Sequence, residues 1–434
     1  MTANFKKYWG AGAFVAALLV GCGGNSGSDS QAKFETKAAL GAALYSDVNL
    51  SKNRTQSCAT CHGLENGLAD NRNQSGVVDG AAFAASLGDD GVSFGDRNAP
   101  SASYMAFSPS FKQGTRERVA SQSSAANIPD YEGFLGGQFW DGREADLAGQ
   151  AGGPPTNPIE MGMESKAAVV ERIMENADYV AAFESLFGAD VFDDAATEDP
   201  AAYTAMAQSI AEFEKTDAEQ FYPFSSKYDR TLTDDFTFDP AGKVALGKVL
   251  FFSSDLTCAS CHQLRENGNR GEIFTSFEYH NIGVPANQAL KDLRESLGLD
   301  GAQAADLGLF NNPNVTAGTE KGKFKVPTLR NVAVTAPYMH NGVFAELETV
   351  IKFYEHARSR ALNSSQPLYP NNPETDQPWA TPEVADNINH DLLGGNDISL
   401  DAAEVEALVC FLISLTDAQY EHLLDADKVA SCGL

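Results

Sequence analysis

The sequence predicts a mainly α protein built from two domains of the same kind. Three observations support this prediction: a length of 434 residues, a five-residue motif that occurs twice, and a helical pattern that precedes both copies. A chain of this length is expected to hold two or three domains. Several stretches have the spacing of amphipathic helices, whereas few have the alternation of a strand.

The repeated motif is Cys-x-x-Cys-His, at residues 58–62 and again at residues 258–262. This pattern is typical of a c-type haem site, in which two thiols bond to one porphyrin and the His binds iron. A zinc ribbon also uses Cys-x-x-Cys pairs, but it does not require a His after each pair. Two covalently bound haem c groups are therefore expected. Their predicted attachment and iron-binding residues are Cys58, Cys61, His62, Cys258, Cys261 and His262.

A similar run of residues precedes each motif. Leu40–Tyr45 reads Leu-Gly-Ala-Ala-Leu-Tyr, and Leu246–Phe251 reads Leu-Gly-Lys-Val-Leu-Phe. The spacing predicts a helix that packs on the haem, followed by a loop that carries the Cys pair. The duplication divides the chain into an N-terminal domain, residues 33–228, and a C-terminal domain, residues 229–434.

Further helices are expected at residues 167–187, 201–221 and 402–416. Cys410 lies in the last of these, and Cys432 lies in the tail that follows. In an oxidising compartment two such thiols can pair. The sequence leaves this pairing open, because disulfide geometry cannot be read from it.

The first 32 residues have the features of an export signal. Lys6 and Lys7 precede an apolar run at residues 10–20, which is too short to span a bilayer and ends at Gly21-Cys22. A small residue before a Cys resembles the bacterial lipobox. We expect a signal peptide at residues 1–21, a lipidated Cys22 and a tether at residues 22–32, with an ordinary signal peptide as the alternative. The expected location is the bacterial periplasm, with membrane attachment through the lipid alone.

The chain is strongly acidic. It carries 59 Asp and Glu against 31 Lys and Arg, a formal charge of −28. This charge disfavours binding to nucleic acid. It would steer a basic redox partner towards the surface, although a role in solubility alone is an equal alternative.

Several longer stretches resemble the bacterial di-haem cytochrome c peroxidase/MauG family. The resemblance covers nearly everything after residue 33 and implies two cytochrome c-like domains packed face to face, with long loops. The most specific matches are Gly95-Asp96-Arg97-Asn98-Ala99-Pro100, Gln138-Phe139-Trp140-Asp141-Gly142-Arg143, His280-Asn281-Ile282-Gly283-Val284-Pro285 and Lys325-Val326-Pro327-Thr328-Leu329-Arg330-Asn331-Val332.

The resemblance implies a peroxide-activating pair, Gln150 and Glu160, over the N-terminal haem. Cleavage of a bound peroxide needs a group that takes a proton from one oxygen and returns it to the other, which a carboxylate can do. Trp140 matches the Trp that passes electrons between the haems. Without the resemblance, Glu160 would be read as a surface residue and Trp140 as a core aromatic.

The resemblance also implies a calcium site between the domains. Asn98 and the backbone carbonyls of Thr335 and Pro337 match the family's ligands. Such oxygen ligands, without a cluster of carboxylates, suit a hydrated Ca²⁺.

Two positions depart from the classical peroxidases. Those enzymes place a second His on the N-terminal haem, but no His lies between His62 and His262. We therefore expect an open or water-bound N-terminal iron, with Met105 as a less favoured ligand. The classical axial Met of the C-terminal haem is replaced by Tyr354, as in the MauG branch.

A phenolate ligand stabilises oxidised iron, whereas Met raises the haem potential. Tyr354 is therefore expected to bind the C-terminal iron. The alternatives are Met339, His356, or a Tyr354 that only packs on its helix.

These features favour a hydrogen peroxide reductase that receives electrons from a small exported cytochrome c or cupredoxin. The alternative is a MauG-like oxidase that modifies Trp or Tyr of a protein partner. A two-haem electron carrier is the least favoured, because a carrier has no use for Glu160 and Gln150 over an open iron.

Overall fold

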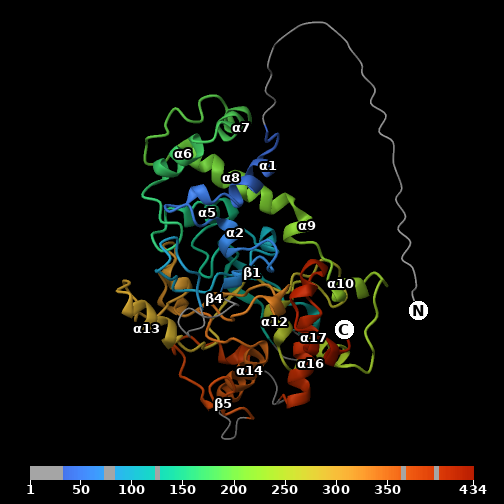
Figure 1. Ribbon diagram of the computed structural model, residues 1–434. Helices are drawn as coiled ribbons and strands as arrows, with labels where there is room; N and C mark the ends of the chain where they lie inside the picture. The colour runs from blue at the N-terminus through green and yellow to red at the C-terminus, as the bar shows by residue number, and fades with distance from the viewer. Residues whose placement is uncertain (1–32, 73–83, 123–127, 363–367, 395–399) are drawn as a thin grey trace, which may run out of the picture.

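The computed structural model describes residues 33–72, 84–122, 128–362, 368–394 and 400–434. It is mainly α, as predicted, and its helices form two groups joined by long loops (Figure 1). None of the helices among these residues is long and apolar enough to cross a membrane. The expected signal peptide, Cys22 and the tether lie outside the described residues.

The N-terminal group surrounds one hydrophobic core, to which residues between Leu40 and Phe221 contribute. It lies at the top of Figure 1. Its helices are α1 (Lys37–Tyr45), α2 (Cys58–Cys61), α5 (Leu147–Ala151), α6 (Lys166–Met174), α7 (Ala177–Phe187), α8 (Ala201–Thr216) and α9 (Ala218–Phe221), with 3-10 turns η1 (Val48–Leu50), η2 (Met105–Phe107) and η3 (Pro154–Thr156).

Two helices that the sequence pattern predicts as continuous are each interrupted. The stretch 167–187 forms α6 and α7, because the side chain of Asn176 accepts a hydrogen bond from Asp178 N and caps a new helix. The stretch 201–221 forms α8 and α9, because Asp217 caps α9 in the same way. Asn and Asp favour such caps, since their side chains satisfy amide groups at a helix start.

The C-terminal group has its own core, formed by residues between Tyr228 and Cys432. Its helices are α10 (Lys227–Thr231), α11 (Lys243–Phe251), α12 (Cys258–His262), α13 (Gln288–Ser296), α14 (Leu347–Ala361), α15 (His390–Gly394), α16 (Ala402–Ile413) and α17 (Ala426–Cys432), with 3-10 turns η4 (Leu309–Asn311), η5 (Gly318–Glu320), η6 (Val332–Val334) and η7 (Ala418–Leu423).

The duplication predicted from the sequence is visible in how two helix pairs cross. Helix α1 packs on α8, and α11 packs on α16. At each crossing a glycine lets the backbones approach: a Cβ on Gly41 would lie 1.9 Å from Ser209 O, and one on Gly247 would lie 1.9 Å from Ala407 O. The two crossings are thus built alike, and each is followed along the chain by the helix that carries a Cys pair, α2 in one half and α12 in the other.

Strands are few and short. In the part of the chain that the structure describes, three antiparallel pairs are formed by β1 (Lys112–Arg116) with β2 (Tyr131–Leu135), β3 (Tyr279–His280) with β4 (Phe324–Lys325), and β5 (Asn371–Asn372) with β6 (Gln377–Pro378). Lys112 pairs with Leu135, Tyr279 with Lys325, and Asn371 with Pro378.

The β1–β2 hairpin belongs to the N-terminal part of the chain but contacts the C-terminal part. Arg116 donates to Ser260 O (2.8 Å), and Gln122, which follows β1, donates to Gln263 Oε1 (2.9 Å). The domain boundary near residue 228 therefore stays a prediction, because the two parts interleave.

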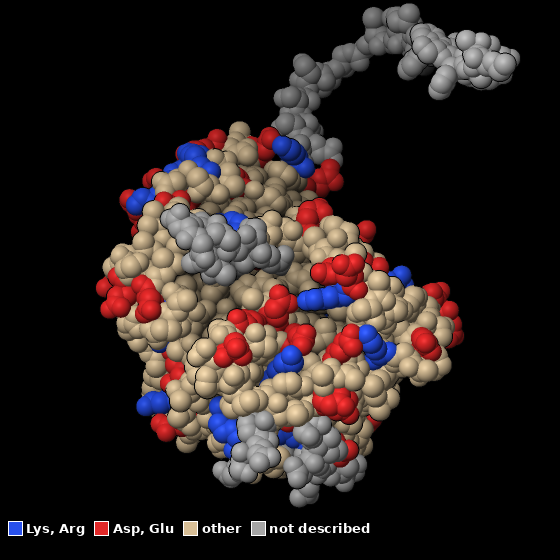
Figure 2. Space-filling view, turned by 60° about the horizontal axis from the view of Figure 1, so that its bottom comes forward, with Lys and Arg blue, Asp and Glu red and all other residues tan. Residues whose placement is uncertain are grey.

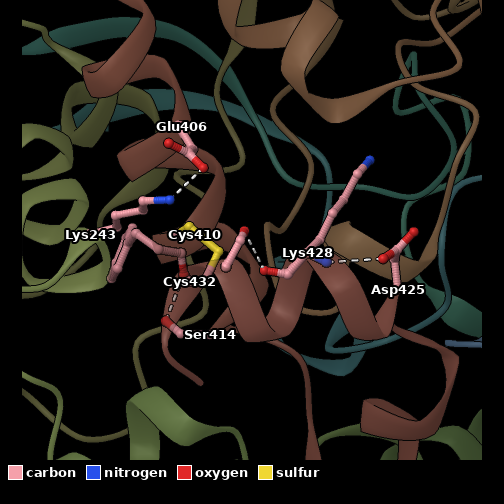
Figure 3. Close-up of a disulfide and its surroundings, with 9 residues drawn as sticks. Lys243, Glu406, Cys410, Ser414, Asp425, Lys428 and Cys432 are labelled. Atoms are coloured by element: carbon pink, nitrogen blue, oxygen red, sulfur yellow. Dashed lines mark hydrogen bonds and ion pairs between the residues drawn. A yellow bond between two sulfur atoms is a disulfide. The ribbon is translucent and has the colours of Figure 1, made fainter.

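A disulfide joins α16 to α17. The Cα atoms of Cys410 and Cys432 are 5.3 Å apart, and both side chains are buried in the C-terminal core (Figure 3). The pairing that the sequence left open is thus present in this structure. It attaches the last helix to the helix that supports α11.

Candidate active site

Each Cys-x-x-Cys-His motif opens onto its own cavity. The first cavity is bounded on one side by Cys58, Cys61 and His62, and on another by residues of α5 and the η3 turn. The second is bounded by Cys258, Cys261 and His262, and by residues of α14. The four thiols form no disulfide. Each site therefore offers two thiols and one imidazole at a largely apolar space.

Both His rings are held by a backbone carbonyl. The Nδ1 atom of His62 lies 3.4 Å from Leu68 O, and that of His262 lies 3.0 Å from Phe274 O. Burial lowers the pKa of His62, and it lowers the pKa of His262 to about 4. Both rings are thus neutral near pH 7, and an Nδ1–H donated to the carbonyl leaves Nε2 as a metal ligand.

Gln150 and Glu160 line the first cavity together with His62. Asp146 caps α5, which carries Gln150, and Glu160 follows the η3 turn that begins with Pro154 and Pro155. Burial raises the pKa of Glu160, while nearby Arg143 and a hydrogen bond from Asn157 oppose that rise. A carboxyl with a raised pKa exchanges protons more readily near neutral pH than an exposed one.

Tyr354 lines the second cavity, where it extends from α14. Burial raises the pKa of its phenol, so the side chain is protonated unless a cation is bound to it. Met339 lines both cavities. His356 lines neither cavity, and its ring stacks on Trp379 with centroids 5.5 Å apart. Of the three alternatives for the C-terminal ligand, Tyr354 and Met339 are therefore placed at the cavity.

Trp140 lies between the two sites. It lines both cavities, whereas Trp379 lines neither of them. Its Nε1 donates to Asn98 O (2.8 Å), and its carbonyl accepts from Lys325 N (2.9 Å). One segment holds the indole of Trp140, and a segment from the other half of the chain holds its main chain.

Asn98 joins the two halves at the predicted calcium ligands. Its side-chain Nδ2 donates to Pro337 O (2.7 Å), and its backbone N donates to His340 O (2.8 Å). Thr335 and Pro337 line the same cavity as Asn98. Two of the three expected ligands, Asn98 and Pro337, are therefore in contact. A half-turn of the Asn98 amide would direct its Oδ1 towards Pro337 O, as a shared cation requires.

Two further residues at the cavities were not predicted as site residues. His340 is buried at the second cavity, its pKa is lowered to about 3, and its Nε2 has no hydrogen-bond partner among the described residues. Glu214 is buried at the first cavity, and its pKa is raised to about 8. A propionate is a natural partner for the unpaired Nε2 of His340, so this atom fits a haem in the second cavity.

His280 belongs to a buried network beside the second cavity. Its Nε2 lies 2.8 Å from Glu278 Oε2, and Glu278 also accepts from Arg118 (2.9 Å). Cys261, Glu278 and His280 come close enough to share a metal ion. Because Cys261 is a predicted haem thiol, and because Glu278 is neutralised by Arg116 and Arg118, the network is better explained as support for α12.

Comparisons with known proteins agree with this arrangement. Residues 35–237 match the family described as di-haem cytochrome c peroxidase. The methylamine utilization protein MauG of Paracoccus denitrificans is 42% identical over 95% of this chain and 97% of its own length. The cytochrome c peroxidase Ccp of Escherichia coli is 31% identical over 73% of this chain and 52% of its own length.

Among solved structures, the diheme peroxidase BthA of Burkholderia thailandensis superposes with a TM-score of 0.66, at 26% identity, over 91% of this chain and 89% of that one. Its fold and the sequence relatives agree with one another. The chain therefore belongs to the di-haem cytochrome c peroxidase and MauG family of oxidoreductases.

Proposed function

We propose that this protein reduces hydrogen peroxide to water, with electrons from a small exported redox protein. The observation that carries the proposal is the first cavity, where Gln150 and Glu160 share one space with His62. An electron carrier needs no proton-transfer group over its iron. The second cavity and Trp140 supply the route by which electrons arrive.

The two haems would be covalently attached, one at Cys58 and Cys61 and the other at Cys258 and Cys261. When bound, each supplies an iron that exchanges electrons, and the iron at His62 also binds peroxide. The pKa of His62 is lowered by burial, so its neutral Nε2 is available to the metal at physiological pH.

Glu160 would take the proton from the oxygen of peroxide nearer the metal and deliver it to the departing oxygen. Its raised pKa suits both steps, because a strongly acidic carboxyl would not hold the proton between them. The Gln150 amide would orient the peroxide through hydrogen bonds. Both residues line the cavity that His62 also lines, so they would face a peroxide bound there.

Trp140 would carry electrons from the second haem to the first. Trp140 lines both cavities, its indole donates to Asn98 O, and its main-chain carbonyl accepts from Lys325 N. Tyr354 would bind the second iron, where an anionic phenolate lowers the potential relative to Met. We also propose that a Ca²⁺ held by Asn98, Thr335 and Pro337 stabilises this junction, and that Cys22 anchors the protein in the periplasm.

A second candidate function is oxidation of Trp or Tyr in a protein partner. Two observations favour it: Tyr354 faces the second cavity, and MauG shares 42% identity over nearly the whole chain. This function would share the first cavity and its proton transfer, and it would differ in where the electrons come from.

The stoichiometry of turnover tests the proposal. Peroxide reduction consumes two electrons and two protons for each peroxide, so two molecules of a ferrous monohaem cytochrome c should be oxidised per peroxide consumed. The measurement follows both species in the same sample. Loss of peroxide without oxidation of the cytochrome would contradict the proposal and favour the second candidate.

A further inference from the structure

The first cavity contains a buried carboxyl that the proposed peroxide chemistry does not use. Glu214 extends from α8, lines this cavity and is only 6% exposed. Among the described residues its carboxyl has no hydrogen-bond or ion-pair partner, and burial raises its pKa. The acidic side chains in the view of Figure 2 lie instead at the surface, among Lys and Arg side chains. A buried carboxyl without a partner lowers stability, so its presence points to a function.

The second half of the molecule has an apolar residue at the equivalent position. Glu214 lies five residues after Ser209, whose carbonyl meets α1 at the first helix crossing. Leu412 lies five residues after Ala407, whose carbonyl meets α11 at the second crossing. Leu412 lines the second cavity as Glu214 lines the first. The shared scaffold therefore accepts an apolar side chain here, and the carboxyl is specific to the first site.

The helix on the other side of each crossing differs in the same way. Tyr45 lies four residues after Gly41 on α1, and Phe251 lies four residues after Gly247 on α11. Tyr45 lines the first cavity, and Phe251 lines the second. The first site thus has a phenol and a carboxyl where the second site has two apolar side chains.

Tyr45 is fixed beside the His that would bind the first iron. The side chain is 1% exposed, and its hydroxyl donates to His62 O (3.1 Å). Its ring packs edge-on against Phe213 and Phe221, with centroids 5.6 Å and 5.9 Å apart. The phenol would therefore lie next to a haem bound in this cavity, in apolar surroundings that shield it from solvent.

The Glu214 carboxyl lies close to the Tyr45 phenol. Burial raises the pKa of Tyr45, and Glu214 is the charged group that adds most to this rise, before Cys58, Tyr420 and Cys61. Once a haem is bonded to the two thiols, Glu214 is the neighbour in this set that can accept a proton as a carboxylate. The hydroxyl and the carboxyl form no direct hydrogen bond, so a proton passing between them crosses a gap that one water can bridge.

We propose that Tyr45 is a redox-active residue of the first haem site and that Glu214 accepts its phenolic proton. This inference rests on the proposed function, because hydrogen peroxide is the oxidant that first takes electrons from the haem. Tyr45 then loses one electron to the oxidised haem, its O–H bond breaks, and the proton goes to the Glu214 carboxylate. A neutral tyrosyl radical remains. One electron from the donor and the proton from Glu214 restore the phenol.

Electron paramagnetic resonance tests the role of Tyr45. Haem-loaded ferric protein is mixed with one equivalent of hydrogen peroxide, without a donor, and samples are frozen at increasing times. We expect the native protein to give an organic-radical signal, which narrows when the chain is made with ring-deuterated Tyr. Tyr45→Phe should abolish this signal. The substitution introduces the residue that the second half has at this position, so the fold should tolerate it.

A second variant tests the proton acceptor. Glu214→Gln keeps the size of the side chain but removes the carboxylate, so it should slow radical formation about 100-fold, the scale expected for a lost proton-transfer group. Tyr338→Phe is the matched control, because Tyr338 also lines the first cavity. It should leave the signal unchanged.

The outcomes separate this inference from the proposed function. Haem absorbance of the same samples reports the peroxide reaction, independently of any radical. A normal reaction without a radical, a signal that persists in Tyr45→Phe, or a signal lost in Tyr338→Phe would overturn the role of Tyr45. An unchanged rate in Glu214→Gln would overturn the role of Glu214. A native protein whose haem absorbance does not respond to peroxide would contradict the proposed function itself, and this inference with it.

Discussion

The two halves of this molecule share a scaffold, but they differ in what covers it. In the N-terminal half α1 packs on α8 and also touches α7, and the cavity beside it contains the polar pair Gln150 and Glu160. In the C-terminal half α11 rests on α16 with one face exposed, and its cavity contains Tyr354. The scaffold positions a Cys pair and a His in both halves.

The two halves differ in the segments that complete each cavity, not in the helices that carry the Cys pairs. The crossings at Gly41 and Gly247 are alike, whereas the segments opposite the His rings come from unrelated parts of the chain: α5 and η3 in one half, α14 in the other. The cavity of one half contains an amide and a carboxyl, Gln150 and Glu160, whereas that of the other contains the phenol of Tyr354. Changes to the loops and added helices can thus separate two roles without altering the haem-binding frame.

The largest expected effect tests the polar pair of the N-terminal half. Replacing Glu160 by Gln should slow the reaction of the protein with peroxide by about 100-fold or more, because it removes the proton acceptor and donor. Stopped-flow absorbance measures this rate. The control is Glu164→Gln, at an exposed carboxylate four residues away that pairs only with Lys52. A normal rate in Glu160→Gln would remove Glu160 from the proposed chemistry.

The next prediction tests the ligand of the C-terminal half. Tyr354→Phe should change the electron paramagnetic resonance spectrum of the second haem and leave that of the first unchanged, because only the second cavity contains Tyr354. Tyr369→Phe, outside both cavities, serves as the control. An unaltered spectrum in Tyr354→Phe would favour Met339 or a Tyr that only packs.

A third prediction asks whether the two helix crossings are equivalent. Gly41→Ala and Gly247→Ala would each place a methyl group 1.9 Å from a carbonyl oxygen of the partner helix, so the helices must separate. Each should lower the free energy of unfolding by about 1–3 kcal/mol, measured by denaturant titration of the haem-loaded protein. Gly318→Ala, where a Cβ meets nothing within 4 Å, is the control. A loss confined to one crossing would show that the scaffold is not shared.

The smallest expected effect concerns the pH dependence that Glu214 gives to the N-terminal half. Burial raises its pKa from 4.5 to about 8, so between these values the folded state binds more protons than the unfolded state. Stability from this group is therefore full below about pH 4.5 and is lost as pH rises to about 8. Glu214→Gln should raise Tm at pH 8.5 more than at pH 5, as measured by calorimetry.

Glu212→Gln, on the same helix, should not reproduce this change, because Glu212 is less buried than Glu214. Equal effects of Glu214→Gln at both pH values would show that Glu214 does not titrate in this range.

The sequence allowed much of this structure to be predicted, for identifiable reasons. The haem motifs and the helices before them are local patterns, and α1 and α11 appear where the repeat placed them. The role of Glu160 came from a resemblance, because nothing local separates it from a surface carboxylate. Its burial beside His62 depends on the turn at Pro154, which brings distant segments together.

Other features could not be predicted, because they depend on packing over long distances. Arg116 and Gln122 donate hydrogen bonds to residues in and just after α12, more than a hundred positions away in the sequence. The unpaired Nε2 of His340 is recognisable only once its burial is known. The breaks between helices at Asn176 and Asp217 could have been predicted from the sequence. Each is marked by a residue that favours a helix N-cap and lies within an apolar helical pattern.

The measurement that tests the central claim most directly is stopped-flow spectroscopy of the fully ferric protein with one equivalent of peroxide and no reductant. We expect the first site to be open, since the chain has no His between His62 and His262 that could close it. Peroxide should then cause a prompt spectral change at both haems, because Trp140 lines both cavities. A protein that stays unreactive until one haem has been reduced would contradict the open site.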